Sequence, residues 1–208
     1  MSLLTAWGYA LTELNDLPPI LSDSEYDEYT AHKYGTDERV NPNLSAAEMA
    51  IRNACGWHVC PSLACKMSTH LMDKRVTRAG RMIMVQLPAT FVSEITSVKI
   101  GATTYTTYVL ETNGILRIYD VSWSGLLPYT TIEVEYTAGI PDNMAAALKE
   151  LIAHRVTHAL ASSNGVQSET AGGVSITYSA NWINNSRSTA LADDNMAVLS
   201  PYILKGVF

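Results

Sequence analysis

The hydrophobic period of the sequence changes between residues 131 and 161. Residues 131–137 alternate apolar side chains with polar ones, among them Glu133 and Glu135, and a period of two is typical of a strand with one buried face. Between Pro141 and Ala161 the apolar residues recur every three to four positions: Leu148, Leu151, Ile152, Val156 and Ala159. This is the period of an amphipathic helix. The chain therefore combines strands with a long helix, which predicts an α+β fold.

Capping signals indicate further helices. Ser22-Asp23-Ser24-Glu25 is a capping box that predicts a helix to about Tyr34, and Ser45-Ala46-Ala47-Glu48 is a second box that predicts a helix to about His58. Residues 189–199 form a last short helical pattern before Pro201.

The predicted strands begin after Arg81, where β-branched and aromatic residues become frequent. Asn113-Gly114 is a hairpin turn signal, and Val174 to Tyr178 alternates like a short strand or an extended arm. The main candidates are residues 82–87, 95–100, 103–110, 114–119 and 131–137.

Helical patterns on both sides of these strands predict an α+β chain with a central β-hairpin or small-sheet insertion and an extended C-terminal tail. In this prediction the chain is one domain overall. Residues 1–80 are the N-terminal helices of the bundle and residues 81–140 are the β insertion. Residues 141–208 comprise the long helix, a mobile loop or arm, a short C-terminal helix and a docking tail.

The net charge of the chain limits which classes of partner it can bind. The formal net charge is -6, and basic residues gather only between Lys74 and Arg81, so a phosphate-binding surface has little to use. We expect no signal peptide, because no basic residue precedes the apolar start, and no membrane-spanning run. Cys55, Cys60 and Cys65 are an odd number in a short stretch, which fits a reducing compartment rather than a disulfide framework.

Two clusters could bind metal. Cys55, His58, Cys60 and Cys65 are chemically suited to zinc, but they lack paired C-x-x-C spacing, so buried small thiols are the better interpretation. His154 and His158 have the spacing of H-E-x-x-H, but Arg155 follows the first histidine where a metalloprotease needs glutamate. We expect no catalytic residue, no metal site and no cofactor. A metal-dependent enzyme that uses these histidines is the alternative from another class.

Several short patterns follow one another in a fixed order. They are Ala54-Cys55-Gly56-Trp57-His58-Val59-Cys60-Pro61, Leu87-Pro88 with residues 95–101, Asn113-Gly114-Ile115-Leu116, residues 133–141, residues 168–178 and Leu199-Ser200-Pro201-Tyr202. No single pattern is specific, but the ordered set, covering roughly residues 17–202, resembles the head-to-tail connector or adaptor family of long-tailed bacteriophages, especially those of actinobacterial hosts.

The resemblance implies a mainly α-helical bundle with this β insertion. It also implies a structural protein without catalysis, located in the virion neck and in the host cytoplasm during assembly. It implies a homo-oligomeric ring, a dodecamer, between the portal protein and a stopper or tail-completion protein. The resemblance further implies that genomic DNA passes through the channel without specific binding and that no membrane is involved. A stopper or tail-completion protein of the same neck is the nearest alternative.

Two sets of residues are candidates for contacts. Glu133 and Glu135 are candidates for a channel or inter-subunit face, because an acidic wall would not retard DNA. The C-terminal segment is too apolar for an uncovered terminus, so it either docks on the portal or another partner, or folds back on its own bundle. Its candidate partner-binding residues are Leu199, Pro201, Tyr202, Ile203, Leu204, Val207 and Phe208.

Overall fold

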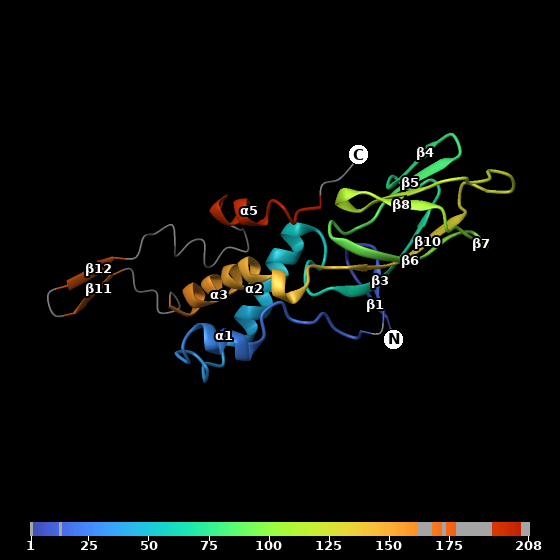
Figure 1. The fold of residues 1–208 in the computed structure, drawn as a ribbon. Helices are drawn as coiled ribbons and strands as arrows, with labels where there is room; N and C mark the ends of the chain where they lie inside the picture. Colours follow the sequence, from blue (N-terminus) through green and yellow to red (C-terminus); the bar gives the residue numbers. More distant parts are fainter. Residues whose placement is uncertain (1, 13, 162–167, 172–173, 178–192, 205–208) are drawn as a thin grey trace. The chain divides into compact units, whose positions relative to one another are not determined.

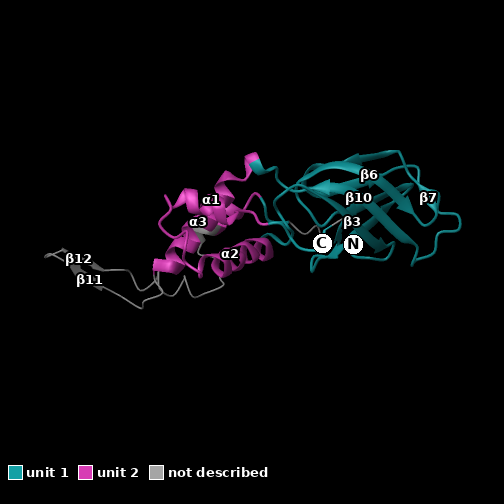
Figure 2. Ribbon diagram, turned by 90° about the horizontal axis from the view of Figure 1, so that it is seen from below, with its two compact units in different colours: residues 1–18, 55–142, 202–208 teal, residues 19–54, 143–201 magenta. Residues whose placement is uncertain are grey.

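The computed structural model describes residues 2–12, 14–161, 168–171, 174–177 and 193–204. The chain divides into two compact units, shown in Figure 2. The β unit comprises residues 1–18, 55–142 and 202–208, and the helical unit comprises residues 19–54 and 143–201.

The larger sheet of the β unit has six strands in the order β1-β2-β3-β10-β6-β7 (Figure 1), with every neighbouring pair antiparallel. Its central strand β10 follows the alternation predicted from the sequence, with Ile132, Val134 and Tyr136 buried. The bounds are β1 Leu3–Leu4, β2 Ala10–Leu11, β3 Leu63–His70, β6 Val92–Ile100, β7 Thr103–Thr104 and β10 Thr131–Ala138.

The second sheet has four antiparallel strands in the order β4-β5-β9-β8. The predicted Asn113-Gly114 turn is confirmed, because it lies in the short helix η1 (Thr112–Gly114) between the paired strands β8 and β9. Gly114 has φ +73°, and a Cβ there would collide with the carbonyl oxygen of Ala89, so this turn requires glycine. The bounds are β4 Val76–Ala79, β5 Met82–Gln86, β8 Tyr108–Leu110 and β9 Ile115–Ile118.

The helical unit is built around α2 and α3. The predicted capping box at Ser22 is confirmed: its side chain accepts from the Glu25 amide, and Glu25 reaches back to the Ser22 amide. Glu25 also accepts a hydrogen bond of 2.5 Å from Lys149 of α3, which ties the two helices together. The bounds are α1 Asp23–Tyr29, α2 Val40–Cys55, η2 Asp142–Met144, α3 Ala146–Ala161 and α5 Asp193–Leu199, with β11 Ser168–Ala171 and β12 Val174–Thr177 forming an antiparallel pair.

The expected mainly α-helical bundle with a small β insertion is wrong, because two antiparallel sheets of six and four strands make the described chain mostly β. Strands β3 and β4 precede Arg81, where strands were expected to begin. β3 alternates between buried and accessible positions. After its first residue, Leu63, it consists of Ala, Cys, Lys, Met, Ser, Thr and His. Few of these residues favour strands by themselves, so pairing with β10 determines the conformation.

The second predicted capping box does not exist. Helix α2 begins at Val40 rather than Ser45, so Glu48 lies inside the helix and is 6% exposed. Its Oε1 accepts hydrogen bonds from the amides of Ile20 (2.8 Å) and Leu21 (2.9 Å). Glu48 therefore holds the segment before α1. Its carboxylate satisfies two backbone amides far away in the sequence, and not the amide of a nearby helix cap.

Candidate interaction site around the C-terminal segment

The apolar C-terminal segment predicted as a docking tail is described as far as Leu204. Leu199 ends α5 and is fully buried, Pro201 is exposed, and Tyr202, Ile203 and Leu204 are half-buried. Val207 and Phe208 lie outside the described residues.

Two hydrogen bonds hold residues 202–204 on the β unit. The indole Nε1 of Trp57 donates to the carbonyl oxygen of Tyr202 at 2.7 Å, and the Leu204 amide donates to the carbonyl oxygen of Cys55 at 2.9 Å. Cys55 is the last residue of α2, and Trp57 belongs to the Gly56-Trp57-His58 turn that follows it. The segment therefore contributes only backbone atoms to these two hydrogen bonds. Its side chains are not needed for them and can contact other groups.

A buried histidine fixes the turn that receives this segment. The carbonyl oxygen of Ala138 can only accept, so Nε2 of His58 donates to it at 2.9 Å. In the neutral imidazole, Nδ1 then accepts from the Tyr9 hydroxyl at 2.7 Å, while the same hydroxyl accepts from the His58 amide at 3.0 Å. Both imidazole nitrogens are therefore used: they join the turn to Tyr9, just before β2, and to Ala138 at the end of β10.

Gly139 allows the turn to approach β10. Its φ is +126°, and a Cβ on it would collide with the carbonyl oxygen of Pro61. Its amide donates to Phe91, and the next amide, of Ile140, donates to Val59 at 2.7 Å. Two patterns found in the sequence therefore contact each other in the structure. They are the turn at 56–61 and the Gly139-Ile140-Pro141 junction.

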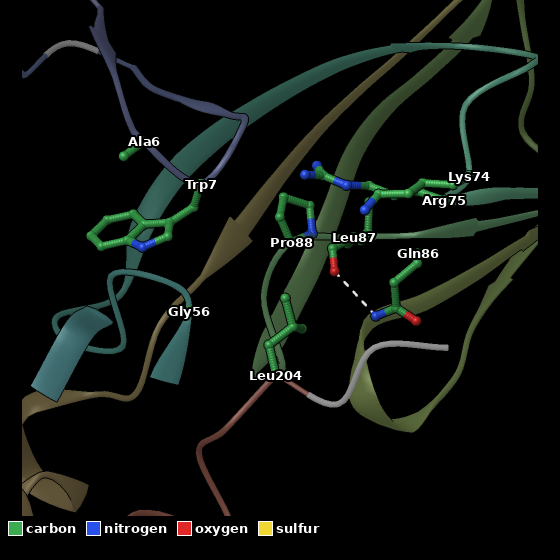
Figure 3. A pocket seen from close by; sticks show the side chains of 9 residues that line it. All are labelled: Ala6, Trp7, Gly56, Lys74, Arg75, Gln86, Leu87, Pro88 and Leu204. Carbon is green, nitrogen blue, oxygen red and sulfur yellow. Dashed lines mark hydrogen bonds between the residues drawn. The ribbon is translucent and has the colours of Figure 1, made fainter. Parts of the chain in front are cut away.

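A cavity of about 250 Å³ adjoins Leu204 on the β unit. Figure 3 shows its lining: Trp7, Leu87, Pro88 and Leu204 supply apolar surface, and Lys74 and Arg75 supply two cations. Such a lining suits a group that combines an apolar part with a negative charge. No local pattern in the sequence predicts this cavity, because its residues come from five separate segments of the chain.

Glu133 and Glu135 lie on the accessible face of β10, but this face is not purely acidic. Nζ of Lys66 in β3 lies 3.3 Å from a carboxylate oxygen of Glu133 and 3.2 Å from one of Glu135. The hydrogen bonds to Glu135 and Glu133 raise the pKa of Lys66. Lys99 of β6 is opposite Glu133 in the register. The strip therefore has mixed charge, and the alternation in β10 alone could not reveal its neighbours.

The candidate zinc ligands serve the core of the β unit. Cys55, Cys60 and Cys65 are buried, and burial raises the pKa of Cys55 and of Cys65 to about 12, which keeps these thiols protonated. Within the part of the chain that the structure describes, no three histidine, cysteine or acidic residues are grouped to hold a metal. There also, no helix is long and apolar enough to cross a membrane.

His154 and His158 are neighbours on α3, with ring centroids 4.6 Å apart. His154 is exposed and His158 is half-buried. Burial, and then the charge of His154, lowers the pKa of His158. Among the described residues, this pair belongs to no group of three or more side chains that could hold a metal ion.

Comparison with known proteins identifies the family. The family model of head completion proteins matches residues 19–187. The chain belongs to the head completion protein family. This membership confirms the resemblance to head-to-tail connector proteins and makes the chain a structural protein of the virion neck.

A solved structure and the curated proteins add less. A chain in the structure described as "Neck of empty GTA particle computed with C6 symmetry" is 18% identical, with a TM-score of 0.48, over 95% of this chain and 97% of that chain. A search of curated proteins found no significant match.

Proposed function

We propose that this head completion protein is the head-to-tail adaptor: a ring, a dodecamer, that binds beneath the portal, extends the DNA channel and offers a docking surface to the stopper or tail-completion protein. The observation that carries the proposal is the family match across residues 19–187, which spans parts of both compact units. An adaptor must bind one partner on each side of its ring, and two units give it two separate surfaces for that purpose.

The C-terminal segment is the proposed portal-binding element, with Leu199, Pro201, Tyr202, Ile203, Leu204, Val207 and Phe208 as its candidate residues. Support comes from the way it is held. Backbone atoms of Tyr202 and Leu204 make the hydrogen bonds to the β unit, and the half-buried Leu204 side chain borders a cavity that is also lined by Lys74 and Arg75. Part of the segment thus rests on its own chain and presents a surface that a partner can cover.

Glu133 and Glu135 remain the candidates for a channel or inter-subunit face. With Lys66 between them, their repulsion of DNA would be weaker than the two carboxylates alone suggest. The net charge of -6 still supports passage of genomic DNA without specific binding.

One alternative function is a stopper or tail-completion protein of the same neck, and the β-rich protomer is compatible with it. Helix-rich ends around a central β insertion would favour an adaptor over a stopper, and the two sheets weaken that argument. A metal-dependent enzyme receives no support from a structural family.

Purified portal rings distinguish the adaptor from the stopper. The chain is mixed with portal rings alone and, separately, with portal rings that already carry the next neck protein. The masses of the complexes are measured, and the complexes are imaged by electron microscopy. An adaptor binds the bare portal directly as a ring. Binding that occurs only after another connector has been added would establish the stopper and refute the proposal.

A further inference from the structure

The Arg75 side chain is a central feature of the cavity beside Leu204. Arg75 is half-buried, and among the residues that the structure describes its guanidinium makes no ion pair and no hydrogen bond. The nearest acidic residue in the sequence, Asp73, accepts instead from the backbone amide of Arg75 at 2.8 Å. A guanidinium carries five N–H donors, so an acceptor from outside these residues would satisfy it.

The backbone around Arg75 defines the position of its guanidinium. A Cβ on Gly8 would lie only 3.0 Å from Nη1 and 3.1 Å from Nη2 of Arg75, so the guanidinium lies close to the glycine backbone. The carbonyl oxygen of Arg75 accepts from the Gln86 amide at 2.8 Å, and the Thr5 amide closes the turn around Gly8 by donating to Tyr9 at 2.9 Å. The cation therefore has a fixed place between two strand connections.

The remaining walls of the cavity are mostly apolar and are also held in place. Figure 3 shows the apolar residues Trp7, Leu87, Pro88 and Leu204. Trp7 is stacked on Tyr9, with ring centroids 6.3 Å apart. Nε2 of Gln86 donates to the carbonyl oxygens of Leu87 at 3.2 Å and Asn113 at 2.8 Å. None of the nine described residues that line the cavity is acidic, so the cavity is prepared for an anion that carries an apolar group.

The size and shape of the cavity select the kind of anion. Its volume of about 250 Å³ suits a side chain rather than a nucleic-acid strand. A planar guanidinium can bind a carboxylate through two parallel hydrogen bonds, and Lys74, which also lines the cavity, adds positive charge. DNA fits less well, because its binding depends on many phosphate contacts along an open surface.

We propose that this cavity is a carboxylate-binding site, which receives the side chain of an acidic residue together with an apolar neighbour from the portal protein. The choice of the portal rests on the proposed adaptor function. It is supported by Leu204, which borders the cavity and belongs to the proposed portal-binding segment. Residues 205–208, which follow Leu204, contain no acidic side chain, so this continuation of the chain offers no aspartate or glutamate to Arg75.

A small carboxylate tests the site without the portal. Phenylacetate joins a carboxylate to an aromatic ring, and phenylacetamide is its neutral counterpart of similar shape. Binding to the purified full chain is followed through the NMR signal of the Trp7 indole. We expect phenylacetamide to bind roughly tenfold more weakly than phenylacetate. Arg75→Gln should weaken phenylacetate binding by about the same factor and leave phenylacetamide binding unchanged.

A matched control separates this site from general charge effects. Arg81→Gln makes the same change at a side chain that is 74% exposed and does not line the cavity, so it should leave phenylacetate binding unchanged. Arg75→Gln should also keep the melting temperature of the unmodified chain, because the guanidinium has no acceptor to lose among the described residues. A clearly lower melting temperature would assign Arg75 to the fold and overturn the inference.

Purified portal rings test the source of the carboxylate. Arg75→Gln should bind them roughly tenfold more weakly than the unmodified chain, whereas Arg81→Gln should bind normally. Excess phenylacetate should weaken portal binding of the unmodified chain, and phenylacetamide should not, which requires no variant. Among Asp→Asn and Glu→Gln substitutions in the portal, one should cause the same loss and add nothing to the loss from Arg75→Gln.

Each part of the inference has its own contrary result. Equal binding of phenylacetate and phenylacetamide, or phenylacetate binding that is unchanged in Arg75→Gln, overturns the carboxylate site. Portal binding that responds to neither Arg75→Gln nor phenylacetate overturns the portal as the source. If the unmodified chain does not bind portal rings at all, the proposed adaptor function fails together with that source, and the phenylacetate measurements still decide on the cavity.

Discussion

Nε1 of Trp57 and the carbonyl oxygen of Tyr202 are joined by a hydrogen bond of 2.7 Å. The indole is completely buried, and a buried indole N–H needs an acceptor. Because the acceptor is a backbone atom, the bond holds the path of the C-terminal segment and leaves the Tyr202 side chain replaceable. This makes the attachment of the segment separable from its proposed docking.

Replacing Trp57 with Phe removes the donor and keeps an aromatic ring. We expect a loss of about 1–3 kcal/mol in the free energy of unfolding and faster hydrogen exchange at the Leu204 amide, which bonds to Cys55 beside the turn. Denaturant titration and exchange measurements test this. Trp123→Phe is the control, because its indole bonds to Gly80. Unchanged exchange at Leu204 in the Trp57 variant would contradict the attachment.

Two buried tyrosines should respond oppositely to loss of the hydroxyl. Tyr9→Phe deprives Nδ1 and the amide of His58 of their partner, so we expect a loss of about 1–3 kcal/mol in stability. The Tyr136 hydroxyl is buried and has no hydrogen-bond partner among the described residues, so Tyr136→Phe should be neutral or stabilising. Thermal unfolding of the two variants decides. Because both variants keep the aromatic ring, equal destabilisation would contradict the assigned difference between the two hydroxyl groups.

The sequence could predict elements whose signals are local. The capping box at Ser22 and the alternation in β10 depend on neighbouring residues, and both are present in the structure. It could not predict β3, whose residues have weak strand propensity, or the role of Glu48, whose partners Ile20 and Leu21 lie some 27 residues away. The candidate site depends even more on distant contacts, since Trp57 and Tyr202 are 145 positions apart.

The ion pair between Glu25 and Lys149 should make stability depend on pH. The hydrogen bonds from Lys149 and Ser22 lower the pKa of Glu25 from an ordinary value of 4.5 to about 2. A folded pKa below the unfolded one adds stability that is complete above pH 4.5 and disappears as the pH falls towards 2. Because the carboxylate is 43% exposed, we expect only about 0.5–1 kcal/mol from the pair.

The variant Glu25→Gln isolates this charge, since glutamine can still serve in the capping box. It should be less stable than the unmodified chain at pH 7 and equally stable near pH 2. Glu25→Ala removes the capping contact as well, so it should remain less stable at both pH values. Denaturant titrations across this range provide the measurement, and a pH-independent difference for Glu25→Gln would refute the assigned ion pair.

The buried cysteines should be inert in the folded chain. Burial raises the pKa of Cys55 and Cys65 to about 12, so their reactive thiolates are scarce at pH 7. We expect slow reaction with a thiol reagent until denaturant is added, less than stoichiometric zinc in the purified protein, and unimpaired assembly after Cys60→Ser or Cys65→Ser. One tightly held zinc per chain would restore the zinc interpretation of this cluster.

Two truncations separate the attached part of the C-terminal segment from the part beyond it. A chain ending at Leu204 keeps the hydrogen bonds to Trp57 and Cys55, so its melting temperature should stay within about 2 °C of the full chain. A chain ending at Ser200 loses both bonds and three half-buried apolar side chains, and should melt at least about 4 °C lower. Thermal unfolding by circular dichroism measures both.

Portal binding gives the second readout. Docking through Val207 and Phe208 predicts that the chain ending at Leu204 is folded yet binds purified portal rings weakly, because many copies of a small apolar contact act together in a ring. Full-length Val207→Ser with Phe208→Ser keeps the length of the segment and should show the same loss. If both bind like the unmodified chain, and only the chain ending at Ser200 fails because it is unstable, the segment serves the fold of its own chain and the portal contact lies elsewhere.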